Sequence, residues 1–416
     1  MRPCRHDKEV ARWLKKDNRR HVYVGTEYRV RLHSHEKPTS TWKATLRYGE
    51  EPFNWERRIN LKRLLTSLTL SMLLLAGCSD GKELNNNDTT TSDTTEEAPP
   101  TVTTDIAMIG DILLHRGIAL YDDYTPSFEP VKDMLTQYDY LIANQESAPI
   151  ANKFGVIGYP RFSSPPRILD TLHYVGVDIV NLANNHTVDW GEEGVQTLFE
   201  NLEKHDMPYF GAYKSDEDRY TPRIIDLNGI TVGLLGYTYD TNGFYLPKNS
   251  PYNVNYIVEN KMLTDIKNLE SLVDVVVVSM HWGPEYVTTE NEEQRRLAKV
   301  LNDAGVEIVF GSHPHILQPY TLLTNDQGEE THIFYSIGNF FATITSAPDT
   351  FIGGAASLKI TKTGNNIDVH SPHFKATSMI LENGRYNIYP LADVQQYAPR
   401  NLDWVRGVLG PDVTVE

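Results

Sequence analysis

The chain has 416 residues, a formal net charge of −16, two cysteines and 40% hydrophobic residues. Two cysteines exclude a disulfide-rich scaffold and a zinc site built from thiolates, and the hydrophobic content excludes a wholly disordered chain. The acidic balance argues against a nucleic-acid binder, which needs a basic face to neutralise phosphates.

The charge is distributed unevenly along the chain. Residues 1–63 contain 17 Lys and Arg against 8 Asp and Glu, which leaves 22 against 47 for residues 64–416. Residues 1–60 show little hydrophobic periodicity and precede a segment that normally begins a chain. We interpret them either as a genuine basic extension or as a mis-assigned start, with translation beginning near Leu61.

Residues 61–77 have the pattern of a secretory signal peptide. Basic residues, the last of them Lys62 and Arg63, precede an uncharged run from Leu64 to Ala76 that is too short to span a bilayer. The run ends in Leu-Ala-Gly before Cys78, which resembles the bacterial lipobox, whose cysteine is lipidated. The alternative is a buried helix with an incidental cysteine. The first interpretation predicts a protein anchored through Cys78 to the extracytoplasmic face of the cell membrane.

Residues 78–104 are expected to form a flexible tether after the lipidated cysteine. The segment from Ser79 to Thr104 lacks aromatic residues and is rich in Thr, Asn and acids. Such a composition cannot bury enough apolar surface to offset its ordering entropy.

In residues 105–343, short apolar runs alternate with helical patterns. This alternation predicts an α/β domain with a largely parallel sheet. Two segments, 195–202 and 297–304, carry apolar residues at the spacing of an amphipathic helix. Residues 344–416 are expected to be a small β-rich extension with a hairpin around Gly364-Asn365-Asn366. The predicted strands are Ile106–Ile109, Tyr140–Ala143, Asp178–Ala183, Ile230–Leu235, Val275–Met280, Val306–Phe310 and Ile333–Ile337.

Polar residues follow six of these strands directly. Since the carboxyl ends of strands in an α/β sheet form one crevice, these side chains are expected to meet there. Each cluster alone is also compatible with a turn or a structural histidine, but together they favour a hydrolytic metal site. The residues at the strand ends are Asp111, Glu146, Asn184, Asn185, His186, His281, His313, His315 and Asn339.

This donor set suits one or two divalent ions such as Mn, Fe or Zn. His186 remains free as a general acid for the leaving group. Arg116 and Arg161 are candidates for pairing with an anionic substrate, or are solvated surface charges, and Asn184 and Asn339 are further substrate-binding candidates. The predicted metal ligands are Asp111, Glu146, Asn185, His281, His313 and His315.

The ordered motifs resemble those of CapA-type poly-γ-glutamate (capsule) synthesis proteins, which are related to calcineurin-like metallophosphatases. The resemblance covers residues 105–343 and implies a four-layer α/β/β/α sandwich with a metal site at the polar strand ends. The motifs are Gly110–Arg116, Asn144–Ser147, Ala183–Gly191, His281–Tyr286, Gly311–His315 and Tyr335–Phe340.

Within that resemblance, His313 and His315 match the closing His-x-His of the metallophosphatases. Two positions depart from the superfamily pattern, because Leu113 stands where a histidine is usual and Glu146 where a bridging aspartate is usual. Glu285 lies in a CapA-like motif and is a further catalytic candidate.

The resemblance implies a lipoprotein that acts in synthesis or export of poly-γ-glutamate capsule, with an anionic polymer as substrate and membrane components of polymer synthesis as partners. It favours a metal-dependent hydrolase. Two alternatives stay open: an extracytoplasmic phosphoesterase unrelated to capsule, and a non-catalytic scaffold that kept the fold.

Overall fold

A computed structural model describes residues 22–23, 29–30 and 99–416. The chain divides into two units, Met1–Asp93 and Thr94–Glu416. In the first unit, β1 (Val22–Tyr23) pairs in antiparallel fashion with β2 (Arg29–Val30). The predicted signal peptide, Cys78 and the tether as far as residue 98 lie outside the described residues.

The second unit contains a nine-stranded sheet built around β3 (Thr101–Leu113). Four strands run parallel to one another, namely β3, β4 (Tyr140–Gln145), β5 (Ile179–Asn181) and β6 (Tyr209–Phe210). The short β15 (Asn339–Ala342) pairs in parallel with the end of β3. Antiparallel strands complete the sheet on the other side: β16 (Ile352–Thr363), β17 (Asn366–Glu382) and β18 (Arg385–Pro390), with β19 (Thr414–Val415) beside β17.

A six-stranded sheet has the order β13-β14-β12-β11-β9-β8. Its four inner strands are parallel, namely β9 (Ile230–Thr238), β11 (Val275–His281), β12 (Ile308–Ser312) and β14 (Glu330–Ile337). The edge strands β8 (Arg223–Leu227) and β13 (Leu317–Thr324) are antiparallel to their neighbours, and β7 (Ala212–Tyr213) pairs separately with β10 (Asn253–Val254).

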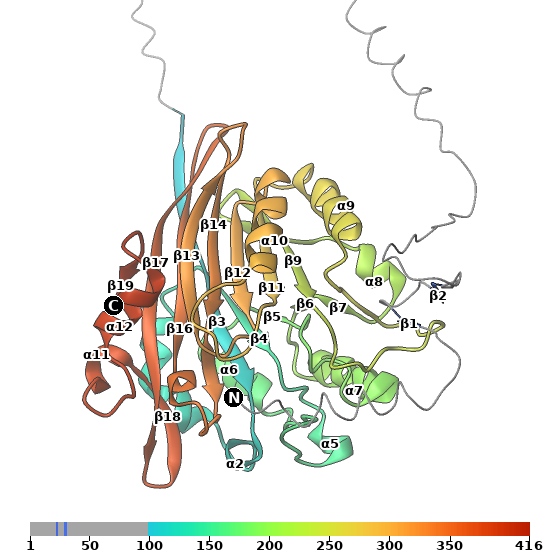
Figure 1. The fold of residues 1–416 in the computed structure, drawn as a ribbon, viewed down its shortest axis with the longest axis vertical. Coiled ribbons are helices and arrows are strands. Elements are labelled where there is room, and N and C mark those ends of the chain that lie inside the picture. The colour runs from blue at the N-terminus through green and yellow to red at the C-terminus, as the bar shows by residue number, and fades with distance from the viewer. Residues whose placement is uncertain (1–21, 24–28, 31–98) are drawn as a thin grey trace, which may run out of the picture. The chain divides into compact units, whose positions relative to one another are not determined.

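The two sheets pack face to face, with helices on both outer faces (Figure 1). Ile106 and Met108 of β3 share a buried cluster with Val277 and Phe310 of the six-stranded sheet. The outer face of the nine-stranded sheet packs on α6 (Ile168–Tyr174) and α7 (Gly191–Lys204), and that of the six-stranded sheet on α9 (Glu259–Glu270) and α10 (Glu292–Asp303). The layers therefore follow the order helix, sheet, sheet, helix.

The prediction of a mixed α/β fold is confirmed. The hydrophobic pattern alone indicated one largely parallel sheet, whereas the family resemblance implied two sheets between helices, and the structure has two sheets. The predicted strands divide between two sheets, and both sheets include antiparallel strands. A hydrophobic run specifies a strand but not its partner, because pairing depends on contacts between distant segments. The hairpin predicted around Gly364 is present, since Thr363 of β16 pairs with Asn366 of β17.

The predicted tether also ends earlier than expected, because Thr101–Thr104 belong to β3. These β-branched residues pair with β16, and the hydroxyls of Thr101 and Thr103 bond to those of Thr363 and Thr361. Such cross-strand threonine pairs stabilise a sheet.

Helices α7 and α10 are present at the predicted positions. α7 buries the whole apolar stripe that predicted it, whereas α10 buries Leu297 and Leu301 and leaves Val300 half-buried. Asn291 and Gln294 form a capping box at the start of α10. In the part of the chain that the structure describes, no helix is long and apolar enough to cross a membrane. The remaining helices are short: α2 (Arg116–Ala119), α3 (Thr125–Phe128), η2 (Glu129–Val131), α4 (Lys132–Leu135), α5 (Ala151–Phe154), α8 (Asp216–Tyr220), η3 (Pro348–Phe351), α11 (Leu391–Val394) and α12 (Leu402–Leu409).

Candidate metal centre

Strand ends from both sheets bring the predicted ligands into one buried group. Asp111 lies near the end of β3, Glu146 directly after β4, and Asn185 in the turn that follows β5. From the other sheet, His281 ends β11, and His313 and His315 follow β12. All six of these side chains are buried.

His281 connects the two halves of this group. Its Nε2 lies 3.0 Å from Oδ1 of Asn185 and 3.7 Å from Oε1 of Glu146, and its Nδ1 lies 2.8 Å from Oγ of Ser312. Burial, reinforced by the neighbouring histidines, holds the pKa of His281 well below its usual value. The ring is therefore neutral at pH 7, which is the form that binds metal ions.

His315 lies between two carboxylates. Its Nδ1 is 3.1 Å from Oδ2 of Asp111 and 3.0 Å from Oδ1 of Asn339, and its Nε2 is 3.9 Å from Oε1 of Glu146. Burial acts to lower the pKa of His315, but the charges of Glu146 and Asp111 outweigh it and raise the pKa to about 9.

Glu146 has the most unusual environment of the group. Its side chain is 0% exposed, and neither carboxylate oxygen has a hydrogen-bond partner in the described part of the chain. Burial and the nearby Asp111 raise the pKa of Glu146 well above its usual value. A buried polar group without partners destabilises a protein, so a positive charge next to this carboxylate would stabilise it.

A divalent cation fits this requirement. Glu146, His313 and His315 each offer a ligand atom, and these atoms lie within 4.8 Å of one another. Nδ1 of His313 is also buried without a partner among the described residues. Carboxylate and imidazole are ligands suited to Zn, Mn and Fe.

The loop that carries the last two histidines has an uncommon backbone. His313 and His315 have φ values of 94° and 61°, in the left-handed region that L side chains rarely adopt. Gly311 precedes them where a Cβ would lie 2.0 Å from the carbonyl oxygen of Tyr335. Only glycine permits this close approach, and strained residues of this kind are concentrated at functional sites.

His186 is held beside the group by a carboxylate. Its Nδ1 lies 2.8 Å from Oδ2 of Asp189, which also accepts a 2.7 Å hydrogen bond from the backbone N–H of Phe162. The ring of Phe162 packs edge to face on His186, with 4.6 Å between centroids. Because Nδ1–H points at Asp189, Nε2 is the ring nitrogen left to exchange a proton with a ligand.

The predicted substrate-binding arginines lie in different surroundings. Arg116 is exposed, and its Nη1 donates to the carbonyl of Val156 at 3.2 Å. Arg161 is half-buried, and its Nε donates to the carbonyl of Asp189 at 2.6 Å. Arg161 is therefore bonded to the residue that orients His186, whereas Arg116 is not.

Asn184 is buried, and its amide is engaged within the protein. It donates to the carbonyl of Gln145 at 3.0 Å and accepts from the backbone N–H of His186 at 3.1 Å. Asn339 contacts His315 and also donates to the carbonyl of Thr350 at 3.1 Å.

Glu285 is exposed in the segment after β11 and makes no hydrogen bond to the buried histidines within residues 99–416. Its charge nevertheless acts on the group, because it adds to the effects of burial and Asp111 in raising the pKa of Glu146.

Several residues of the site were not predicted from the sequence. Asp189 follows His186 by three residues, a spacing that could have identified it, and Asn144 lies within the motif Asn144–Ser147. Asn242 and Tyr239 come from a loop without any motif. Asn242 accepts from Asn185 at 3.4 Å, and the ring of Tyr239 lies 4.6 Å from that of His313.

His115 is a further histidine near the group, and no role for it was predicted from the sequence. Its ring packs edge to face on Phe162, with 5.2 Å between centroids. Burial, with small contributions from His315 and His186, lowers the pKa of His115 to about 4.

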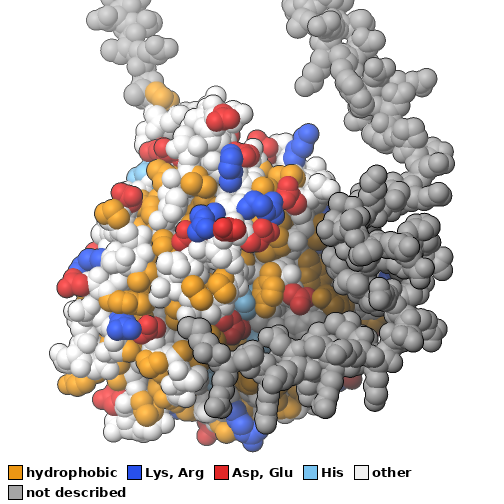
Figure 2. All heavy atoms as spheres, viewed as in Figure 1, with side chains coloured by type: hydrophobic (Ala, Val, Ile, Leu, Met, Phe, Trp, Pro, Cys, Tyr) orange, Lys and Arg blue, Asp and Glu red, His pale blue; other side chains and the backbone are white. Residues whose placement is uncertain are grey.

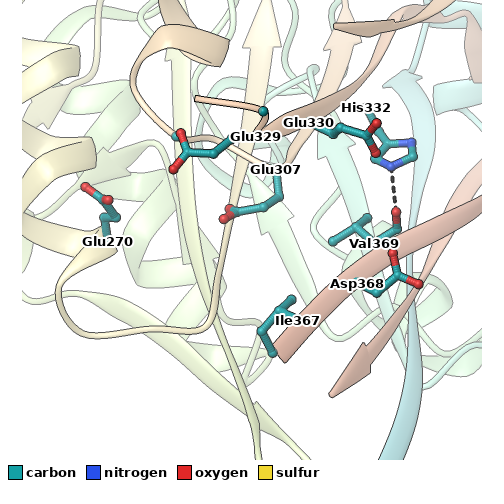
Figure 3. A pocket seen from close by; sticks show the side chains of 10 residues that line it. Glu270, Glu307, Glu329, Glu330, His332, Ile367, Asp368 and Val369 are labelled. Carbon is teal, nitrogen blue, oxygen red and sulfur yellow. Dashed lines mark hydrogen bonds between the residues drawn. The ribbon is translucent and has the colours of Figure 1, made fainter. Parts of the chain in front are cut away.

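An acidic pocket lies at the end of the six-stranded sheet opposite to the candidate metal centre (Figure 3). Glu307 precedes β12 and Glu330 begins β14, whereas His313 and His315 follow the other end of β12. Glu307 is partnered, because its Oε2 accepts from the backbone N–H of Val276 at 2.7 Å. This pocket is separate from the candidate metal centre.

The surface charges are mixed in sign. On the face drawn in Figure 2, acidic and basic side chains lie next to one another. Along α10, Arg296 pairs with Glu293 at 2.9 Å and Lys299 with Asp303 at 2.7 Å. Exposed pairs of this kind contribute little to stability but neutralise the local field.

Comparison with solved structures found calcineurin-like phosphoesterase YfkN from Bacillus subtilis, with a TM-score of 0.39 and 19% identity over 74% of this chain and 96% of that one. A putative 5'-nucleotidase from Staphylococcus aureus has a TM-score of 0.43 and 16% identity over 70% of this chain and 54% of that one.

Among curated proteins, this chain is 29% identical over 245 residues to PGA biosynthesis protein CapA of Bacillus subtilis (strain 168), covering 56% of this chain and 62% of that protein. It is 30% identical over 248 residues to capsule biosynthesis protein CapA of Bacillus anthracis, covering 56% and 59%. The match therefore spans about three fifths of each relative. Residues 105–343 match the family described as "Bacterial capsule synthesis protein PGA_cap". Because this match covers more than half of the chain, the protein belongs to the bacterial capsule synthesis protein PGA_cap family.

Proposed function

We propose that this protein is an exported, membrane-anchored lipoprotein that acts on poly-γ-glutamate during capsule synthesis through a metal-dependent hydrolytic site. The observation that carries the hydrolytic part is the buried Glu146 carboxylate, which has no hydrogen-bond partner in the described part of the chain and lies beside His313 and His315. Family membership supports the capsule part.

One or two divalent ions, Mn, Fe or Zn, would be held by Glu146, His313 and His315, with Asp111, Asn185 and His281 adjacent. When bound, such ions polarise a carbonyl or phosphoryl oxygen and lower the pKa of bound water. The protein's own contribution is to bury these ligands and to place His186 next to them. His186 donates a proton from Nε2 to the leaving group, and Asp189 holds the ring in the orientation that this requires.

The same donor set supports a second candidate, a phosphoesterase that acts outside the cytoplasm. Histidine and carboxylate ligands around a divalent ion suit phosphoryl transfer as well as amide hydrolysis. Substrate preference, measured on one preparation, separates the two functions.

The test uses the full chain loaded with Mn²⁺, Fe²⁺ or Zn²⁺, with metal content measured and hydrolysis followed on poly-γ-glutamate and on p-nitrophenyl phosphate. We expect bound metal and cleavage of the polymer, and we expect His313→Ala to abolish both. His332→Ala is the matched control, because His332 is also buried but contacts Tyr320 and the carbonyl of Val369 instead. Cleavage of the phosphoester alone would support the phosphoesterase. Full activity in His313→Ala, or metal binding without any hydrolysis, would contradict the proposed hydrolytic function.

Anchoring through Cys78 is proposed from the signal-like segment and the cysteine that follows it. Cell fractionation of the wild type and of Cys78→Ser tests it. The wild type should remain with the membrane and the variant should be released, whereas equal distribution of the two would contradict the anchor.

A further inference from the structure

Arg161 packs against two aromatic rings and is held by a hydrogen bond. Its Cζ lies 4.6 Å from the ring centroid of Trp190 and 4.9 Å from that of Phe244, and its Nε donates to the carbonyl of Asp189 at 2.6 Å. Aromatic faces attract a guanidinium group without neutralising its charge. The side chain is therefore positioned in advance, at little further cost in conformational entropy on binding.

This guanidinium has no counter-ion among the residues that the structure describes. No carboxylate of residues 99–416 lies within 4.0 Å of it, and its Nη1 and Nη2 have no hydrogen-bond partner there. Two other half-buried arginines differ in this respect, since Arg219 contacts Asp265 and Arg223 contacts Asp218, each at 2.5 Å. Arg161 therefore keeps the two nitrogens that can bind an anion in bidentate fashion.

Its position is next to the candidate metal centre. The following residue, Phe162, packs on His186, and Asp189 contacts both Arg161 and His186. Phe244, which covers one face of the guanidinium, belongs to the same loop as Asn242, whose Oδ1 accepts a hydrogen bond from Asn185. The loop from Tyr239 to Tyr245 thus contacts both the metal-ligand candidates and Arg161.

We propose that Arg161 binds a carboxylate of the substrate adjacent to the bond presented to the metal centre, so that the substrate carries an anionic group at this second position. This inference rests on the proposed function. In a γ-linked glutamate polymer, each residue whose side-chain carbonyl forms the amide keeps a free α-carboxylate close to that amide. Arg161 thereby selects γ-linked polyglutamate over chains that lack this carboxylate.

Local selection of this kind is needed because the chain as a whole repels polyanions. Residues 64–416 contain 22 basic against 47 acidic residues, so long-range attraction cannot collect the polymer. A charge-assisted bidentate contact acts at short range and supplies about 10- to 100-fold in affinity.

The test measures binding to the full chain loaded with Mn²⁺ by calorimetry. Three probes are compared. The first is a γ-linked glutamate trimer, the second is the same trimer with its α-carboxylates converted to carboxamides, and the third carries phosphate esters in place of the carboxylates as its anionic groups. We expect the wild type to bind the carboxylate trimer at least 10-fold more tightly than the amide, and Arg161→Ala to reduce this preference to less than 3-fold. Phe244→Leu removes one of the two aromatic rings that pack against Arg161 and should give an intermediate preference.

The matched control is Arg385→Ala, because Arg385 also stacks on an aromatic ring, that of Tyr121 at 4.4 Å, and donates to a backbone carbonyl, that of Asp123. It should keep the wild-type preference. The inference is overturned if the wild type binds carboxylate and amide equally, or if Arg161→Ala keeps the preference unchanged. If the phosphate probe binds more tightly than the carboxylate trimer, the choice of carboxylate as the ligand is overturned. Hydrolysis is measured separately, so loss of hydrolysis with the preference intact counts only against the proposed function.

Discussion

Asn144 donates from Nδ2 to Oδ1 of Asp111 at 2.7 Å, and both side chains are fully buried. The amide oxygen of Asn144 in turn accepts from Asn181 at 3.0 Å. Asp111 also contacts His315. The carboxylate of Asp111 is therefore oriented from both sides before any ion is bound, and it depends on a residue that is not itself among the ligand candidates.

Replacing Asn144 should weaken metal binding without removing a ligand. We expect Asn144→Ala to lower metal affinity by about 10- to 100-fold, the usual effect of losing a partner that orients a ligand. Metal titration with a competing chelator measures this. Asn302→Ala is the control, because Asn302 is also buried and donates to Thr331 at 2.9 Å, but lies on α10. Equal metal affinities in the two variants would contradict the orienting role.

Asp189 should matter for turnover more than for metal content. Asp189→Asn removes the negative charge beside Nδ1–H of His186, so we expect kcat to fall by about 10- to 100-fold while bound metal is unchanged. The exposed pair of Asp170 and His205, 2.6 Å apart, offers Asp170→Asn as the control with wild-type activity. An unaltered kcat in Asp189→Asn would show that His186 does not need this carboxylate.

Glu146 should destabilise the protein when metal is withdrawn. Because burial raises its pKa, the folded protein binds a proton more tightly than the unfolded chain, and stability falls as pH rises above the ordinary value of 4.5. At pH 8 without metal we expect Glu146→Gln to be more stable than the wild type by about 1–3 kcal/mol. Adding Mn²⁺ should raise the melting temperature of the wild type only. An equal rise in both proteins would count against Glu146 as a ligand.

Metal binding should release a proton from His315. With a pKa of about 9, this side chain is protonated at pH 7, and a ligand nitrogen must lose its proton. The apparent affinity should therefore increase by up to about tenfold per pH unit between pH 6.5 and 8.5. Calorimetry in two buffers of different ionisation enthalpy detects the released proton. Identical binding heats in both buffers would contradict the prediction.

The acidic pocket of Figure 3 should make stability depend on pH in its own way. Burial, with the nearby Glu270 and Glu329, raises the pKa of Glu307 to about 7. The folded state then holds a proton that the unfolded chain loses. The contribution of Glu307 to the free energy of unfolding is therefore highest below about pH 4.5 and declines as pH rises to 7. Urea unfolding at pH 5 and pH 8 should show this contribution, on the order of 2 kcal/mol, reduced in Glu307→Gln. The exposed Glu293→Gln should keep the wild-type difference.

The beginnings of several strands could be predicted from the sequence. β4, β9 and β11 start at the predicted Tyr140, Ile230 and Val275. Their ends lie further along than predicted, because polar residues such as Asn144 and His281 continue the parallel ladders. Hydrophobic patterning stops at the first buried polar residue, and such residues remain in a strand only when tertiary partners satisfy them.

The site was predictable only where ligands follow strands. His313 and His315 could be placed together with Glu146 because strand ends converge in α/β folds. The contacts of Asn242 and Phe244 could not be foreseen, because a loop of ordinary composition reaches the site through contacts with distant segments. The hydrophobic pattern alone did not divide the strands between two sheets for the same reason, and only the family resemblance implied that division.

The pairing of β3 with β16 sets the order in which this domain can be completed during synthesis. Residues 101–109, in the strand that carries Asp111, have residues 355–363 as their neighbours on one side. The bond between Thr101 and Thr363 joins positions 262 residues apart. A chain that emerges N-terminus first therefore leaves this edge of β3 unpaired until residue 363 has been translated. Pairing between segments so far apart in sequence makes folding slow and leaves an open sheet edge exposed in the meantime.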